Sequence, residues 1–155
     1  MVAAVLTVSS SLARGEGEDV SGPALAGLCR GAGLEVSVEV VPDDREAIAA
    51  ALRRLCDEAD VRFVFTTGGT GLTPDDVTPE ATREVIEREA PGYAESIRAD
   101  SREHTPLGIL TRGVSGVRGR TLIVNFPGSP KAIGQSWPLV EPTLKHAAET
   151  LQRRA

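Results

Sequence analysis

The run from Val2 to Val8, VAAVLTV, is apolar almost throughout and has the length of a β-strand. Near-continuous apolar runs of this length are typical of parallel strands that are covered on both faces. The run is far shorter than the roughly 20 residues that span a bilayer, and it lacks a basic segment or a small-residue cleavage signature. It therefore predicts a buried first strand and no membrane segment.

Segments with helical periodicity alternate with further strand-like runs. Apolar residues recur at helical spacing from Gly22 to Ala32, and a second apolar stripe follows Pro42, where Asp43 or Asp44 can cap a helix. Thr78 is a candidate N-cap, with Pro79 in the favoured first helical position. Further expected helices cover residues 93–103 and 144–151, and further expected strands cover residues 34–41, 61–65, 114–117 and 122–126.

This alternation predicts right-handed crossovers and helices on both faces of a sheet. The expected fold is α/β, a three-layer α/β/α sandwich with a mainly parallel central sheet. The strand over residues 34–41 alternates apolar with polar residues, which favours a place near an edge, and Pro42 ends it. The length of 155 residues fits a single domain over residues 1–155, with its tail from Gln152 expected to fray.

Charge and reactive side chains exclude several classes of function. The net charge is −5 and the basic residues are scattered, which argues against nucleic-acid binding. Cys29 and Cys56 lie in predicted helices without a CxxC pair, which predicts reduced core thiols and a cytoplasmic setting. His104 and His146 stand outside any recognisable catalytic pattern, so we expect surface residues and neither a triad nor a zinc site.

Four polar, glycine-containing or acidic segments each follow the carboxyl end of a predicted strand. They are residues 7–15, 42–44, 66–76 and 125–131. In open α/β sheets ligands bind at this edge, so the four segments predict one shared pocket. The alternative is that these loops are polar only because turns require such residues.

The segment from Thr66 to Asp76, TTGGTGLTPDD, is the densest of the four. Its glycines allow backbone amides to approach a phosphate, and the hydroxyls of Thr67 and Thr70 add donors. It is not a P-loop, because no lysine follows the glycines. Asp75 and Asp76 are either caps of the next helix or oxygen ligands of the kind that Mg²⁺ prefers, shared with Asp43 if that loop reaches the same edge.

The segment from Asn125 to Lys131, NFPGSPK, turns from a predicted strand into a helix start. The amides around Gly128 and Ser129 are suited to a second anion, and Lys131 is suited to neutralising charge on a transferred phosphate. The alternative is a rigid Pro-Gly turn followed by an exposed lysine. Both interpretations stay open at the level of these residues.

Three motifs together resemble the molybdopterin adenylyltransferase family of molybdenum-cofactor biosynthesis, to which the gephyrin G domain is related. They are TTGGTGLTPDDVTPEAT, VPDD at Val41–Asp44 and NFPGSPKA at Asn125–Ala132, and the likeness extends to VLTVS, EDVSGPAL and REAPGY. The resemblance implies transfer of adenylate from Mg-ATP to the terminal phosphate of molybdopterin, with release of pyrophosphate. It also implies a homotrimer and contact with other enzymes of the cofactor's synthesis.

The resemblance also assigns roles to individual residues. It implies that Asp76 and Asp43 bind Mg²⁺ and take part in catalysis with Lys131, and that Asp75 has no equivalent acid. The implied nucleotide and phosphate site comprises Ser9, Ser10, Thr67, Gly68, Gly69, Thr70 and Gly71. The implied molybdopterin site comprises Asn125, Pro127, Gly128 and Ser129.

Ser10 departs from the family pattern, in which an acid follows the first serine after this strand. A serine hydroxyl forms hydrogen bonds but supplies no carboxylate charge. Ser10 therefore favours a second hypothesis, a non-catalytic member of the family that binds molybdopterin or nucleotide or serves as a scaffold. Retention of Asp43 favours the enzyme. A third hypothesis is a general nucleotide-dependent phosphotransferase.

Overall fold

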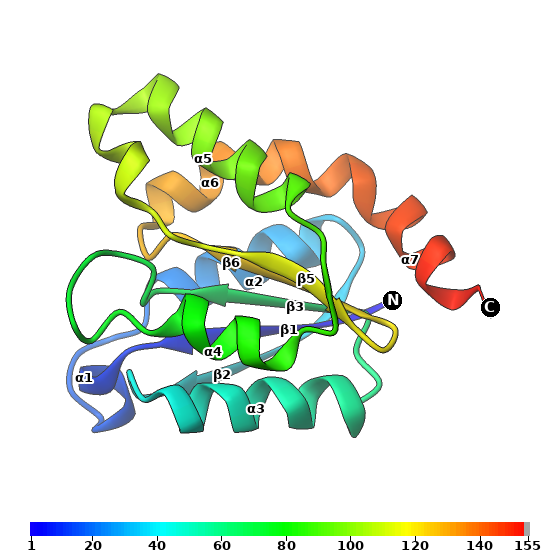
Figure 1. Cartoon of the computed structure of the whole chain (residues 1–155), viewed down its shortest axis with the longest axis horizontal. Coiled ribbons are helices and arrows are strands. Elements are labelled where there is room, and N and C mark those ends of the chain that lie inside the picture. Colours follow the sequence, from blue (N-terminus) through cyan, green and yellow to red (C-terminus); the bar gives the residue numbers. More distant parts are fainter. Residues whose placement is uncertain (154–155) are drawn as a thin grey trace.

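A computed structural model describes residues 1–153 and places a six-stranded sheet at the centre of the molecule (Figure 1). The strands lie in the order β2-β1-β3-β6-β5-β4. Their bounds are β1 Val2–Val8, β2 Glu35–Val41, β3 Phe63–Thr67, β4 Arg88–Glu89, β5 Ser115–Arg118 and β6 Thr121–Phe126. The apolar runs correspond to β1, β3 and β6, and the strand with alternating residues corresponds to β2, at the edge of the sheet.

The sheet is mainly parallel. β2, β1, β3 and β6 run in one direction, so that their carboxyl ends meet at one edge. β5 pairs antiparallel with β6, through a tight turn in which Gly119 has a φ of +55°, and β4 pairs antiparallel with β5. A positive φ is a conformation that glycine adopts readily. Connections long enough to hold helices join the parallel strands, as parallel pairing requires.

Helices cover both faces of the sheet, which confirms the three-layer α/β class (Figure 1). One face packs against α2, α5, α6 and α7, and the other packs against α3 and α4. The helix bounds are α1 Ser10–Ala13, α2 Ser21–Gly31, α3 Arg45–Asp57, α4 Thr78–Val85, α5 Gly92–His104, α6 Pro130–Val140 and α7 Leu144–Gln152, with 3-10 turns η1 Pro106–Leu110 and η2 Glu141–Thr143. Of the tail expected to fray, Gln152 is the last residue of α7, and residues 154–155 lie outside the described residues.

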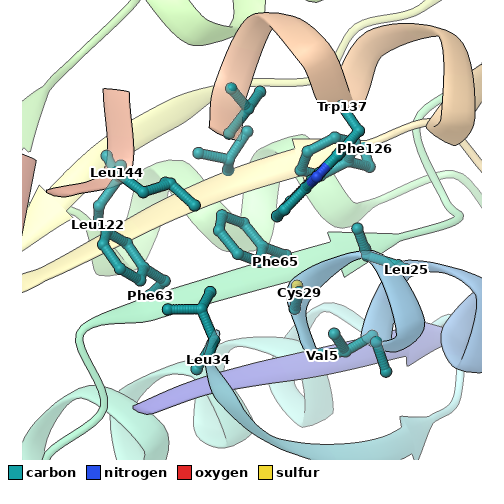
Figure 2. Packing of buried hydrophobic residues seen from close by; sticks show 14 of the residues in the cluster. Val5, Leu25, Cys29, Leu34, Phe63, Phe65, Leu122, Phe126, Trp137 and Leu144 are labelled. Carbon is teal, nitrogen blue, oxygen red and sulfur yellow. The ribbon is translucent and has the colours of Figure 1, made fainter. Parts of the chain in front are cut away.

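An aromatic cluster fixes the strands that lead to the carboxyl edge (Figure 2). The ring of Phe65 meets those of Phe126 and Trp137 edge to face, with centroids 5.6 and 5.7 Å apart. Burying each of these side chains stabilises the fold by about 2 kcal/mol, and edge-to-face pairing adds a smaller increment. The cluster holds β3, β6 and α6 in a fixed relation. The loops that follow β3 and β6 therefore begin from a rigid base.

The boundaries of α4 differ from those expected. Thr78 does not cap this helix, because its hydroxyl donates to the carbonyl of Gly68 at 2.9 Å, and Val77 takes the N-cap position. The sequence places the helix breakers Pro91 and Gly92 after this segment, but the helix already ends at Val85, because residues 88–89 pair with β5 as a short edge strand. Asp44, by contrast, caps α3 as one of two expected candidates, accepting from the Ala47 amide at 2.8 Å.

Candidate active site at the carboxyl edge of the sheet

A cavity of about 290 Å³ opens where the strand order reverses. The chain leaves β1 toward β2 on one side and returns to β3 on the other, so the loops that follow β1 and β3 separate. This is the crevice in which open α/β sheets bind ligands. The cavity is lined by Thr7, Val8, Ser9, Leu12, Glu18, Asp19, Val20, Ser21, Thr67, Gly68 and Gly128. Ser9, Thr67, Gly68 and Gly128 are among the residues that sequence reasoning selected.

Main-chain atoms approach closely at the base of this cavity. Gly68 has a φ of +95°, and a Cβ there would lie only 2.5 Å from the carbonyl oxygen of Val8. A Cβ on Gly128 would lie 3.5 Å from the Cα of Gly68. The hydroxyl of Thr67 donates to the carbonyl of Pro127 at 2.8 Å. The ends of β1, β3 and β6 are therefore joined with little space for side chains between them.

Asp19 organises the opposite wall. Its Oδ2 accepts a hydrogen bond from the Thr7 hydroxyl at 2.8 Å, and its Oδ1 accepts from the Gly22 amide at 2.9 Å. The Ser21 hydroxyl donates to the carbonyl of Gly128 at 2.6 Å, which ties the start of α2 to the loop after β6. Neither Asp19 nor Ser21 was predicted as a site residue from its own sequence context. The only signal for them was the EDVSGPAL stretch of the family resemblance.

Ser10 and Asp43 connect the loops that follow β1 and β2. The Ser10 amide donates to Oδ2 of Asp43 at 2.8 Å, and the Asp43 amide donates to the Ser10 hydroxyl oxygen at 2.9 Å. Ser9 caps the short helix α1, accepting from the Leu12 amide at 3.3 Å. The structure thus brings Ser9, Ser10 and Asp43 together at the expected edge.

Asp76 folds back on its own turn. Its Oδ2 accepts from the amide and the hydroxyl of Thr73, at 3.0 and 2.8 Å. A Cβ on Gly71 would lie 2.7 Å from the same oxygen, so the glycine makes room for the carboxylate. Asp75 is exposed and forms no side-chain hydrogen bond with the described residues. The two adjacent acids therefore have different surroundings, with only Asp76 held in place.

Asp43 and Asp76 each keep one carboxylate oxygen open to a ligand. Each carboxylate uses Oδ2 for protein hydrogen bonds, and within residues 1–153 no protein donor is bonded to either Oδ1. Mg²⁺ in phosphate-handling sites usually takes one or two carboxylates and completes its shell with water and substrate phosphates. Over the same residues, no group of three or more His, Cys, Asp or Glu side chains gathers as a self-sufficient metal site.

Arg112 binds the glycine turn from the side of the sheet that carries β5. Its Nε donates to the carbonyl of Gly71 at 2.7 Å, one Nη donates to the carbonyl of Asp76 at 2.6 Å, and the other donates to Glu80 at 2.5 Å. The hydrogen bond from Arg112 lowers the pKa of the Glu80 carboxyl, and Glu80 in turn raises the pKa of Arg112. None of the sequence motifs predicted that Arg112 belongs to the site.

The segment after β6 divides into inward and outward parts. Asn125 is only 2% exposed, and its amide nitrogen donates to the hydroxyls of Thr66 and Thr82 at 2.9 and 3.0 Å. Its Oδ1 accepts from the Val114 amide at 3.1 Å. The structure therefore does not bring Asn125 to the cavity, contrary to the expected role in binding molybdopterin, because the side chain is used inside the fold.

The other residues of this segment remain at the edge. Ser129 caps α6, accepting from the Ala132 amide at 3.4 Å, and exposed Lys131 lies in the first turn of that helix. Lys131, Asp43 and Asp76 do not line the 290 Å³ cavity itself. Asp43 and Asp76 lie in the loops after β2 and β3, and Lys131 lies at the start of α6 after β6, so all three follow the carboxyl ends of parallel strands. The turn after β3 and helix α1 are found at this same edge (Figure 1). A larger cavity, of about 460 Å³, lies along α5 and residues 111–115.

The sequence matches a family model described as a probable molybdopterin binding domain over residues 4–146. It is 37% identical over 150 residues to the molybdopterin adenylyltransferase of Helicobacter pylori strain J99, covering 95% of this chain and 85% of that protein. It is 39% identical over 149 residues to the molybdenum cofactor synthesis protein cinnamon of Drosophila melanogaster. That match covers 95% of this chain but a quarter of the length of the Drosophila protein.

A solved structure shares the whole fold. The molybdopterin biosynthesis enzyme MoaB of Thermus thermophilus aligns with a TM-score of 0.89 and 45% sequence identity. The alignment covers 97% of this chain and 95% of the MoaB chain. The likeness therefore includes the sheet, both helical layers and the loops at the carboxyl edge.

Proposed function

Because the chain belongs to the family of probable molybdopterin binding domains, we propose that it transfers adenylate from ATP to the terminal phosphate of molybdopterin. Relatives that align over most of both chains carry the name molybdopterin adenylyltransferase. The observation that carries the proposal is the placement of Asp43 and Asp76 in loops at the same carboxyl edge as the turn formed by Gly68 and its neighbours.

The reaction is a phosphoryl-type displacement at the α-phosphorus of ATP. An oxygen of the pterin's terminal phosphate forms the new bond, and the bond to the bridging oxygen breaks as pyrophosphate leaves. Such transfers depend on alignment and charge stabilisation and require no protein nucleophile. The sequence predicts no catalytic triad, and that expectation is consistent with this requirement.

Each loop has a part in this scheme. Asp43 and Asp76 would hold Mg²⁺, which when bound supplies positive charge to the phosphates of ATP. The amides of Gly68, Gly69 and Gly71 bind phosphate oxygens, with Ser9, Ser10, Thr67 and Thr70 at their borders. Lys131 stabilises charge on the leaving pyrophosphate. Pro127, Gly128 and Ser129 form the molybdopterin side of the site, and Asn125 supports it from within.

Dependence on the pterin tests this proposal. The purified chain is incubated with Mg-ATP, with and without molybdopterin, and pyrophosphate and adenylylated pterin are measured. We expect both products only when molybdopterin is present. Pterin binding without either product would instead support the non-catalytic hypothesis, and ATP hydrolysis without pterin would support a general phosphotransferase. Chelation of Mg²⁺ with EDTA should abolish the products, and added Mg²⁺ should restore them.

The proposal extends to assembly and setting. The proposed setting is the cytoplasm and the proposed assembly is a homotrimer. Self-association is supported by exposed apolar side chains in η1, where Leu107, Ile109 and Leu110 are 68, 62 and 41% exposed. Exposed apolar side chains that gather in one segment are typical of protein–protein contacts. In residues 1–153, no helix combines the length and apolar character that crossing a membrane requires. Light scattering coupled to size exclusion should give three times the mass of the chain.

A further inference from the structure

We propose that Arg112 is a positioning residue for adenylate transfer, because it fixes the turn that carries Asp76. The inference rests on the proposed function, since it concerns how that site is held in its working geometry. Arg112 lies in the segment between η1 and β5, more than thirty residues from the turn in sequence.

Arg112 holds both ends of the turn. Its backbone amide donates to the carbonyl of Thr70 at 2.8 Å, and its Nε donates to the carbonyl of Gly71 at 2.7 Å. At the other end, one Nη donates to the carbonyl of Asp76 at 2.6 Å. Between these points the Asp76 carboxylate bonds back to Thr73. The segment from Thr70 to Asp76 is therefore a closed loop, and Arg112 fastens its two ends to one another.

The charge of Arg112 is already matched within the protein. Glu80, in the first turn of α4, accepts from its guanidinium at 2.5 Å. An arginine that is paired in this way has its donors occupied by protein acceptors and contributes little net charge to a phosphate. Its contribution is geometric: a planar guanidinium reaches two carbonyls and a carboxylate in different directions at once, which a lysine ammonium on a flexible stem does not reproduce.

The segment that carries Arg112, from η1 to Gly113, is bound to α5. Gly108 packs on the backbone of that helix so closely that a Cβ would lie 2.4 Å from the carbonyl carbon of Ser101. Arg98, also on α5, donates to the carbonyls of Thr111 and Gly113 at 3.1 and 3.3 Å. These contacts fix the backbone near Arg112 to α5, and the hydrogen bonds of Arg112 in turn fix the turn after β3.

Two substitutions separate geometry from charge. Arg112→Gln removes both properties and should lower kcat/KM for pterin-dependent pyrophosphate release by about 10²-fold, the loss expected when a catalytic group is displaced by about 1 Å. Arg112→Lys retains the charge, and we expect at least about a tenfold loss, since a point charge does not span the three acceptors. Activity in Arg112→Lys equal to that of the unmodified protein would overturn the inference.

Arg118 supplies the matched control. Like Arg112, it pairs with one carboxylate, that of Asp57 at 2.9 and 2.7 Å, and donates to a carbonyl, that of Val85 at 3.1 Å. It lies on β5, away from the turn. Arg118→Gln should keep kcat/KM within about twofold. A loss in Arg118→Gln as large as that in Arg112→Gln would mean that both act only through overall stability, and would overturn the positioning role.

Hydrogen exchange provides a readout that does not depend on activity. In Arg112→Gln, amides in peptides covering residues 68–77 should exchange at least about tenfold faster, while peptides from β1 and β6 exchange as before. Unchanged exchange over residues 68–77 would refute the positioning role even if activity fell. If the unmodified protein released no pyrophosphate, the proposed function would fail, and the exchange data would still decide whether Arg112 holds the turn.

Discussion

Ser10 and Asp43 hydrogen bond to each other twice, each side chain accepting from the backbone amide of the other, at 2.9 and 2.8 Å. The pair joins the loops after β1 and β2. The family resemblance places an acid at residue 10, yet the acceptor that the Asp43 amide requires is supplied here by a neutral hydroxyl. The serine thus meets a structural need of the loop without adding a second negative charge beside Asp43.

Ser10→Ala removes one of the two bonds. We expect the free energy of unfolding to fall by about 1 kcal/mol, the usual net value of one hydrogen bond, and activity to fall as Asp43 becomes less restrained. Ser10→Asp keeps an acceptor but sets like charges side by side, and should not raise activity more than about threefold. Urea unfolding and the pyrophosphate assay measure both effects. A tenfold gain in Ser10→Asp would show that the serine limits catalysis.

Asp76→Ala and Asp75→Ala differ by one position and should differ in effect. In the described part of the chain, Asp76 Oδ2 is hydrogen bonded to Thr73 and Oδ1 has no protein donor, whereas Asp75 is exposed without a side-chain partner. We expect Asp76→Ala to abolish adenylate transfer while the far-ultraviolet circular dichroism stays unchanged. Asp75→Ala should retain activity within about twofold. Equal activity in the two variants would exclude Asp76 from the reaction.

Two glycine substitutions should change stability in opposite directions. Gly68→Ala places a Cβ 2.5 Å from the Val8 carbonyl at a φ of +95°, and should destabilise the protein by about 2 kcal/mol or more. Gly134 lies within α6 with open space around its Cα, so Gly134→Ala should stabilise by about 0.5 to 1 kcal/mol. Thermal unfolding midpoints report both. A neutral Gly68→Ala would mean that the turn relaxes away from β1.

The Cys29 thiol makes stability depend on alkaline pH. Burial raises the pKa of Cys29 from 9.0 to about 12. Below pH 9 the thiol is neutral in both states, so its contribution is fully present. As pH rises further, the unfolded chain ionises first, and the free energy of unfolding falls by up to about 1.4 kcal/mol per pH unit until the folded thiol ionises near pH 12.

Urea unfolding at several pH values between 8 and 11 tests this dependence. Cys29→Ala should be less stable at pH 8, because it leaves a cavity, but its decline with rising pH should be shallower. Burial also raises the pKa of Cys56, to about 11, so part of the slope should remain in the variant. Parallel declines in the two proteins would assign the pH dependence to other groups.

The sequence carried enough information for the layers and for most of the sheet. Near-continuous apolar runs predicted β1, β3 and β6, and alternation predicted the edge position of β2, because burial on one or two faces dictates these patterns. The two-residue strand β4 escaped prediction, since Arg88 and Glu89 carry no apolar pattern. Its formation depends on β5, which lies distant in sequence.

The candidate site was predicted in part for a similar reason. Motifs placed the carboxyl-edge loops and their acids, but the direction of a side chain depends on its strand. Successive side chains of β6 point to opposite faces of the sheet, so Asn125 lies on the same face as Ile123. That face packs against α4, where Thr82 accepts a hydrogen bond from Asn125. Arg112 acts through hydrogen bonds to segments more than thirty residues away, and Asp19 bonds to Thr7 on β1 as well as to nearby Gly22, so local spacing does not reveal all of these partners.

The base of the cavity, where Gly68 lies against the end of β1 and Gly128 lies against Gly68, consists mostly of main chain. The shape of the base therefore depends mainly on the path of the backbone and less on the side chains around it. Substitutions that accumulate over evolutionary time reach the rim of the cavity more readily than its base. Divergence within such a fold can therefore change the side chains at the rim while the backbone at the base keeps its shape.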